Sequence, residues 1–239
     1  MRPPIWLIAA AACAVVWIFT AALPWAARAL TALLVGAMPI FAVAQLRTLA
    51  DPTELPRMAA YASTAITLWA LAALTAGASF ASAYSRTELG LAFIPASRIL
   101  PWSAGITMTA VAATLLLRRM GIEESPLLRH LLPQTTRERF AFAGLSVTAG
   151  VCEELIFRGF LLVALTRASG SVLAAVAVST LVFGWAHAYQ QAAGAVRAGT
   201  LGLLLALPPV FAGTIIPSMI AHTCIDLIGG LWLRDRAAK

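Results

Sequence analysis

The sequence predicts an all-α membrane protein, a polytopic bundle of about eight transmembrane helices. Of its 239 residues, 61% are hydrophobic and only 11% are charged, and the mean hydropathy is +0.87. Soluble globular domains carry about 25% charged residues, so this chain has too few charges to cover the surface of a soluble fold. The apolar segments are long and lack the alternation of barrel strands, and an open sheet edge in lipid would leave peptide groups unpaired.

A helix needs about 20 apolar residues to cross the hydrocarbon core of a bilayer. The first apolar segment, 5–22, exceeds the core of about 7–15 residues in a secretory signal, so we expect a span. The last two segments are separated only by Gly213, after Pro208-Pro209, and form either one broken helix or two short ones. The predicted spans are 5–22, 29–46, 58–79, 99–117, 141–163, 171–190, 198–212 and 214–233.

The basic residues lie almost entirely in the short segments between these spans. Net charge is +7, and Lys239 is the only lysine. With both termini inside, twelve basic residues fall on the cytoplasmic side and four outside, which is the asymmetry that orients membrane proteins. We therefore expect cytoplasmic termini, an even number of spans and no nucleic-acid partner. The longest polar segment, 118–139, predicts a cytoplasmic loop with a short surface helix, and Thr136 is a candidate cap for the next span.

Six ionisable residues fall inside predicted spans, all within the last hundred residues and none in the first four spans. A charged side chain at the bilayer centre costs at least about 2.5–3.5 kcal/mol for Asp or Arg on insertion scales. Such residues usually face a cavity or one another, so we expect the chemistry of the protein here. They are Glu153, Glu154, Arg158, His187, His222 and Asp226.

The spacing of these residues predicts which of them are neighbours. Glu154 and Arg158 are four residues apart and should form an ion pair on one helix face. Glu153 is rotated about 100° from Glu154 on an α-helix, so it can face a cavity while its neighbour is neutralised. His222 and Asp226 are again four apart, so the carboxylate can orient the imidazole. Taken singly, each residue is equally compatible with a hydrogen bond between helices.

Carboxylates and imidazoles in one cavity suit the activation of water. The carboxylate takes a proton from water, and an imidazole holds the water or stabilises an oxyanion. The same side chains supply donors that could bind a metal ion such as zinc. The common zinc-protease motif His-Glu-x-x-His is absent. The candidate metal ligands are Glu153, His187, His222 and Asp226.

Three motifs carry a resemblance to a known family. Residues 153–158 read Glu-Glu-x-x-x-Arg, residues 183–187 read Phe-x-x-x-His, and residues 222–226 read His-x-x-x-Asp. In this order on separate spans, they resemble the CAAX-processing and bacteriocin-processing (CPBP) family of intramembrane peptidases. The eukaryotic branch of that family is the Ras-converting CAAX prenyl endopeptidase. The resemblance covers about 141–233.

The resemblance implies a role for each matching residue. Glu153 would be the general base that activates water, and His187 would help to hold that water. Glu154 would pair with Arg158 and fix the helix. His222, with the residue four positions later, would stabilise the oxyanion. The family is regarded as glutamic-type, which implies no metal cofactor, with zinc as the alternative.

Position 226 departs from the prenyl-protease branch of the family, which has Asn there. An ionised Asp226 can only accept hydrogen bonds, so the oxyanion role does not transfer to it. Asp226 would orient His222 instead, or be protonated.

The resemblance also implies an organisation and a substrate class. Residues 141–239 would form the catalytic helices, with the active-site cavity among the last four. Residues 1–140 would supply N-terminal transmembrane helices and the cytoplasmic loop of the same integral membrane unit. The expected function is an intramembrane endopeptidase that cleaves a membrane-anchored protein or peptide within the lipid bilayer or at its edge.

The Ala- and Arg-rich, Lys-poor composition is typical of bacteria with GC-rich genomes, so we expect a bacterial cytoplasmic membrane. One alternative is a non-catalytic bacteriocin self-immunity or membrane scaffold protein. Another is a small transporter with a proton-relay carboxylate, which predicts paired helical repeats that the sequence lacks.

Overall fold

The computed structural model describes residues 4–45, 55–121 and 124–233, and within these ranges every regular element is a helix. The predicted all-α fold class is confirmed. In the described ranges, three π-helical segments continue neighbouring α-helices, at Leu33–Ala37, Leu155–Leu161 and Ile228–Leu233. The α-helices are α1 (Ile5–Phe19), α2 (Trp25–Ala32), α3 (Met38–Gln45), α4 (Arg57–Ala81), α5 (Ala96–Arg119), α6 (Pro126–Leu131), α7 (Thr136–Glu154), α8 (Leu162–Ser169), α9 (Val172–Ala186), α10 (Gln191–Leu205), α11 (Leu207–Ala212) and α12 (Ile216–Leu227).

Five of the eight predicted spans coincide with helices that are long and apolar enough to cross a membrane. The predicted spans 5–22 and 171–190 correspond to the shorter apolar helices Ile5–Phe19 and Val172–Ala186. The last, 214–233, corresponds to α12 and its π-helical continuation. The five long helices are Trp25–Gln45, Arg57–Ala81, Ala96–Arg119, Thr136–Ser169 and Ala188–Ala212.

The two final predicted spans are separate helices. Helix α11 ends before Gly213, whose φ of 68° lies in the left-handed region that glycine adopts without strain. The turn that follows is fastened to the segment before α5. There, Ile215 N–H donates to the Gly90 carbonyl at 2.9 Å, and Thr214 Oγ1 donates to the Ala92 carbonyl at 2.9 Å. These bonds fix where α12 begins.

Helix α7 begins one residue earlier than the sequence predicted. Its N-cap is Thr135, not Thr136, which already has helical geometry. The Thr135 side chain accepts from the Glu138 N–H while the Glu138 carboxylate accepts from the Thr135 N–H, a reciprocal capping box. The short helix expected in the polar segment before it is α6.

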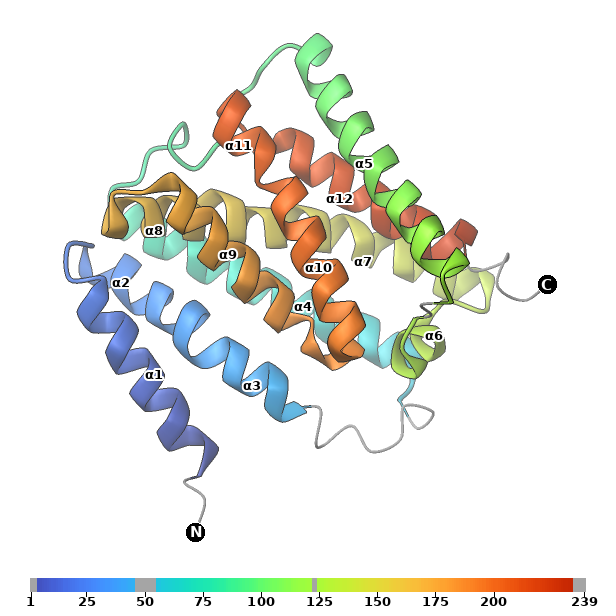
Figure 1. The fold of residues 1–239 in the computed structure, drawn as a ribbon, viewed down its shortest axis with the longest axis horizontal. Helices are drawn as coiled ribbons and strands as arrows, with labels where there is room; N and C mark the ends of the chain where they lie inside the picture. Colours follow the sequence, from blue (N-terminus) through green and yellow to red (C-terminus); the bar gives the residue numbers. More distant parts are fainter. Residues whose placement is uncertain (1–3, 46–54, 122–123, 234–239) are drawn as a thin grey trace.

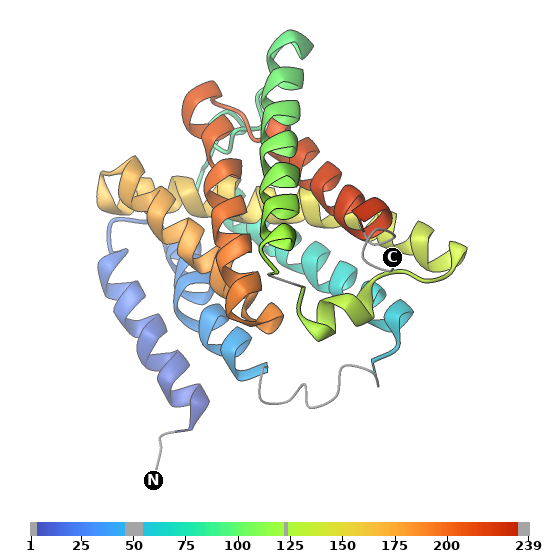
Figure 2. The ribbon, with the colours of Figure 1, turned by 45° about the vertical axis from the view of Figure 1, so that its right-hand side comes forward.

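Helix α7 lies at the centre of the arrangement (Figures 1 and 2). Helices α4 and α12 both pack along it, α5 packs on the outer side of α12, and α9 packs between α8 and α10. Helices α1 to α3 form one edge of the molecule (Figure 1). The C-terminal end of α7 is therefore enclosed by helices from both halves of the chain.

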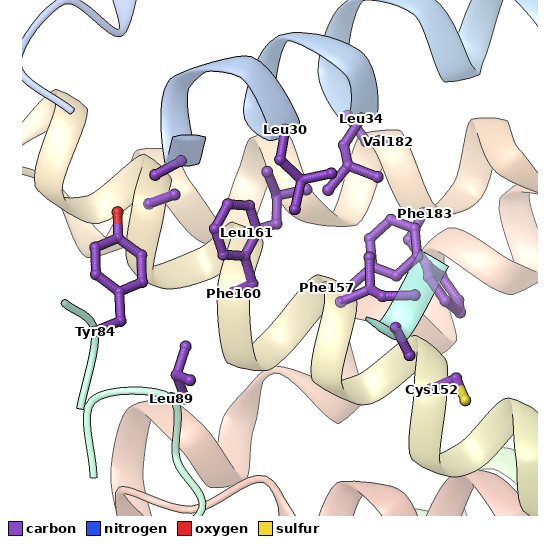
Figure 3. Packing of buried hydrophobic residues seen from close by; sticks show 14 of the residues in the cluster. Leu30, Leu34, Tyr84, Leu89, Cys152, Phe157, Phe160, Leu161, Val182 and Phe183 are labelled. Carbon is purple, nitrogen blue, oxygen red and sulfur yellow. The ribbon is translucent and has the colours of Figure 1, made fainter. Parts of the chain in front are cut away.

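The hydrophobic core lies around the π-helical segment Leu155–Leu161, which directly follows α7. Phe160 and Leu161 are fully buried against Leu30 from α2, and Phe157 packs edge-on against Phe183 with ring centroids 5.0 Å apart (Figure 3). Burial of such aromatic side chains gives large apolar stabilisation and a defined geometry. This packing fixes the chain immediately after the Glu153-Glu154 pair.

The loop between α4 and α5 is fastened to the end of α8 by charged side chains. Arg167 forms an ion pair with Glu88, and its guanidinium lies 4.2 Å above the ring centroid of Tyr84. Glu88 also accepts from the N–H and the hydroxyl of Ser85, at 2.8 and 2.9 Å. Bonds to Ser85 and to Arg167 lower the pKa of Glu88 from 4.5 to about 2.

We expect the Glu88 carboxylate to make thermal stability depend on acid pH. Because its pKa is lower in the folded state, its contribution is present above about pH 4.5 and is lost as pH falls toward 2. The effect should be small, since both partners are more than a third exposed. Thermal unfolding in detergent should show wild type slightly above Glu88→Gln at pH 7 and the two converging near pH 2. An unchanged difference across that range would contradict this.

Candidate active site

The paired glutamates form the last turn of α7, where the helix continues into the π-helical segment. Glu154 is fully buried, and the Glu153 side chain is 15% exposed. His222 and Asp226 lie one turn apart on α12, which packs along α7. The two motifs, far apart in sequence, therefore meet between these helices.

Glu154 and Arg158 form the ion pair that their spacing predicts. Arg158 Nη1 donates to Glu154 Oε1 at 3.0 Å, and both side chains are buried. Arg158 Nη2 donates to the Gly202 carbonyl on α10 at 3.0 Å. The guanidinium lies 4.2 Å from the ring centroid of Phe183 on α9, a cation–π contact. Arg158 thus joins the π-helical segment after α7 to both α9 and α10.

His222 provides a contact that the sequence did not predict. Its Nδ1 lies 2.8 Å from Glu154 Oε1, so one carboxylate oxygen is shared by Arg158 and the imidazole. Sequence spacing could not reveal this, since the residues are 68 positions apart. The contact depends on how α12 is rotated against α7.

The other ring nitrogen of His222 faces two carboxylates. Nε2 lies 3.9 Å from Glu153 Oε2 and 3.9 Å from Asp226 Oδ2. These distances are too long for direct hydrogen bonds and suit an intervening water or reacting oxygen. Glu153 Oε2 is buried and has no hydrogen-bond partner within the described ranges. It is therefore available to accept a proton at this position.

His187 is connected to this group through Phe183. It is the C-cap of α9, and its Nδ1 lies 2.8 Å from the Phe183 carbonyl, which can only accept. Nδ1 therefore donates, and Nε2 is left as the nitrogen able to accept. The Phe183 ring centroid lies 4.7 Å from that of His187 and 6.1 Å from that of His222. All six ionisable residues predicted within spans thus lie in one connected region.

In the part of the chain that the structure describes, His, Cys, Asp and Glu side chains form no group of three or more that could hold a metal ion. His222 also has Nδ1 engaged with Glu154, which leaves only Nε2 for a ligand. No step of the proposed reaction is routed through a metal.

An apolar groove of about 330 Å³ lies away from these residues, between α5 and the α10–α11 junction. Ile106 on its α5 wall packs with Leu205 and Ala221, and none of the six ionisable residues lines the groove. The remaining lining residues are Pro101, Trp102, Gly105, Thr109, Leu204 and Leu207.

Gly150 sets the close approach of α7 and α12. A Cβ atom there would lie 2.2 Å from Thr223 Oγ1 and 2.8 Å from the Met219 carbonyl oxygen. Both contacts flank His222 on α12, so the missing side chain allows the imidazole to reach Glu154. The sequence contains the glycine but does not show which helix it meets.

We expect Gly150→Ala to destabilise the protein and disturb the site. Overpacking of this kind typically costs about 1–3 kcal/mol. Gly144→Ala on the same helix is the matched control, because a Cβ there meets nothing within 4 Å and alanine favours helix by up to about 1 kcal/mol. Thermal unfolding in detergent should place the melting temperature of Gly150→Ala below wild type and that of Gly144→Ala at or above it. Equal melting temperatures would contradict the close packing.

Comparison with protein families finds a match over the helices that carry these residues. Residues 135–228 match the family of type II CAAX prenyl endopeptidase Rce1-like proteins. The match contains all three motifs, begins at the N-cap of α7 and ends just after α12. Neither the curated proteins nor the solved structures include a match to the chain. In this multi-pass membrane protein, residues 135–228 are thus similar to the Rce1-like CAAX protease family, the family that the three motifs resemble.

Proposed function

We propose that the protein is an intramembrane endopeptidase that hydrolyses a peptide bond in a membrane-anchored protein or peptide. The observation that carries the proposal is the position of Glu153. Its Oε2 is buried, has no hydrogen-bond partner among the described residues and faces His222 Nε2 at 3.9 Å. A carboxylate and an imidazole so spaced suit water activation beside a carbonyl group.

In the proposed reaction, Glu153 takes a proton from a water molecule that His187 Nε2 helps to hold. The resulting hydroxide attacks the carbonyl carbon of the substrate, and negative charge develops on the carbonyl oxygen. His222 Nε2 donates to that oxygen, and Asp226 favours the protonated imidazole from 3.9 Å away. Glu153 then passes its proton to the leaving amine as the C–N bond breaks.

The proposed setting is a bacterial cytoplasmic membrane with both chain ends on the cytoplasmic side. The arginine distribution between the apolar helices supports this orientation. A peptide bond at membrane depth would come from a substrate that is itself anchored in the bilayer.

Cleavage of a defined substrate tests the function. Purified protein in liposomes is incubated with membrane-anchored peptides that vary around one candidate bond, and products are identified by mass spectrometry. We expect cleavage at a single peptide bond by wild type and none by Glu153→Gln. Equal cleavage by both proteins would contradict the role of Glu153. A folded wild-type protein that cleaves no anchored peptide would favour self-immunity or scaffolding instead.

We further predict that activity needs no metal ion. In the proposed reaction the carboxylate and the imidazoles act on water and on the carbonyl oxygen directly, so no Lewis acid is required. Elemental analysis of purified protein should find no stoichiometric zinc, and chelators should leave cleavage intact. Stoichiometric zinc, with activity lost to chelator and restored by zinc alone, would overturn this prediction.

A further inference from the structure

We propose that Glu154 is a positioning residue that holds His222 in the form protonated on Nδ1 and thereby directs Nε2 to Glu153 and Asp226. The effect of this positioning on catalysis rests on the proposed peptidase function, whereas the protonation of His222 Nδ1 does not depend on it. The resemblance assigns Glu154 only to the pairing that fixes its helix. The geometry gives it a second task.

The argument begins with the donors around one oxygen atom. Glu154 Oε1 lies 3.0 Å from Arg158 Nη1 and 2.8 Å from His222 Nδ1. A guanidinium group can only donate, so Oε1 acts as an acceptor toward it. The carboxylate paired with this guanidinium is ionised and has no proton to donate, so the proton of the bond to His222 lies on Nδ1. Glu154 is fully buried, so bulk water does not compete for the imidazole.

The carboxylate itself is held in place by groups outside the catalytic set. Arg158 is fixed by the Gly202 carbonyl and by the Phe183 ring. A Cβ atom on residue 202 would lie 3.2 Å from Arg158 Nη2, so glycine leaves room for the guanidinium. A continuous series of contacts thus runs from α10 through Arg158 and Glu154 to His222 on α12.

The orientation matters because the two ring nitrogens have different surroundings. With Nδ1 bonded to Glu154, Nε2 is the nitrogen that faces Glu153 and Asp226. A carboxylate bonded to one imidazole nitrogen sets the tautomer and orientation of the other. Because Nδ1 already carries a proton, Nε2 can donate to the carbonyl oxygen only in the doubly protonated imidazolium, which the carboxylate bonded to Nδ1 stabilises.

A purely structural role for the Glu154–Arg158 ion pair predicts a different result. If Glu154 only paired with Arg158, replacing both residues together would remove the ion pair without stranding a charge and would leave His222 unaffected. Replacement of a buried pair by apolar residues of similar volume is often neutral or stabilising. The double variant Glu154→Leu with Arg158→Met therefore separates the two roles while the protein stays folded.

The test is nitrogen NMR of ring-labelled histidine, which distinguishes protonated from unprotonated ring nitrogens. The chain has three histidines, so His130→Gln and His222→Gln suffice to assign the His222 signals. We expect Nδ1 to be protonated in wild type and in Glu154→Gln, whose amide oxygen still accepts. The double variant should lose this state and show a different tautomer mixture. Its kcat should fall about 10²-fold or more, as expected when an oxyanion donor is impaired, with KM within a few-fold, and Glu154→Gln should recover part of the loss.

An unprotonated His222 Nδ1 in wild type would overturn the proposal, as would a double variant with unchanged His222 signals or wild-type kcat. The expected NMR results in a protein that cleaves no peptide would support the positioning role and refute only the peptidase function. If wild type cleaves peptide but the double variant shows unchanged His222 signals, the peptidase function would be supported and the positioning role refuted.

Discussion

Replacing Glu153 with glutamine is expected to abolish peptide cleavage while leaving the protein folded. The amide has nearly the same shape as the carboxylate but cannot take a proton from water. General base catalysis contributes about 10²–10⁴-fold to rate, so kcat should fall by at least the lower figure. Stability should change little, because Glu153 Oε2 has no hydrogen-bond partner in the described residues and its nearest charged contact is 3.9 Å away.

Glu138→Gln is a matched control on the same helix. Glu138 lies in the first turn of α7, and glutamine at this capping-box position preserves the reciprocal bonds with Thr135. It should therefore keep activity and lower the melting temperature at most slightly, because the partly exposed pairing of Glu138 with Arg57 at 3.9 Å contributes little. Cleavage by Glu153→Gln at the wild-type rate, measured with the same peptides and with both variants folded, would remove Glu153 from the reaction.

The fold class was predictable because it is determined by lipid, the solvent that surrounds most of the chain. Long apolar segments with charges only between them indicate a helical bundle in lipid, and helices are found at each predicted span. The ends of the helices were less predictable, because they depend on individual hydrogen bonds and backbone angles. Thr135 rather than Thr136 caps α7 because Thr135 has extended backbone geometry and Glu138 returns a bond to it. The separation of α11 from α12 depends on the backbone angle of Gly213 and on bonds to the Gly90 loop.

The candidate site was predictable only within each helix. The Glu154–Arg158 pair follows from a four-residue spacing, and the ionisable residues stand out because lipid disfavours them. The contact between Glu154 and His222 could not be predicted, because it depends on the rotation and approach of α7 and α12. Gly150 permits that approach because any side chain there would collide with Thr223. No local sequence pattern indicates that Gly150 faces Thr223. The catalytic roles of Glu153, His187 and His222 stay predictions.

Replacing Arg158 with alanine should cause the largest loss of stability among single changes in this region. Arg158 is 2% exposed, and its removal leaves the buried Glu154 carboxylate without its cation. Breaking a buried pair from one side typically costs about 3–5 kcal/mol. The bond to the Gly202 carbonyl and the contact with Phe183 are lost as well. We therefore expect a low folded yield in detergent and loss of cleavage.

A second arginine, Arg167, tests whether burial is the cause of the stability loss expected for Arg158→Ala. Arg167 also pairs with a glutamate and covers an aromatic ring, but its side chain is 37% exposed. Arg167→Ala should therefore cost only about 0–1 kcal/mol. If the stranded charge dominates, Glu154→Leu with Arg158→Met should be more stable than Arg158→Ala, although it changes two residues. Melting temperatures of the three variants in one detergent decide this. A normal yield and melting temperature for Arg158→Ala would mean that α7 is held by its apolar contacts alone.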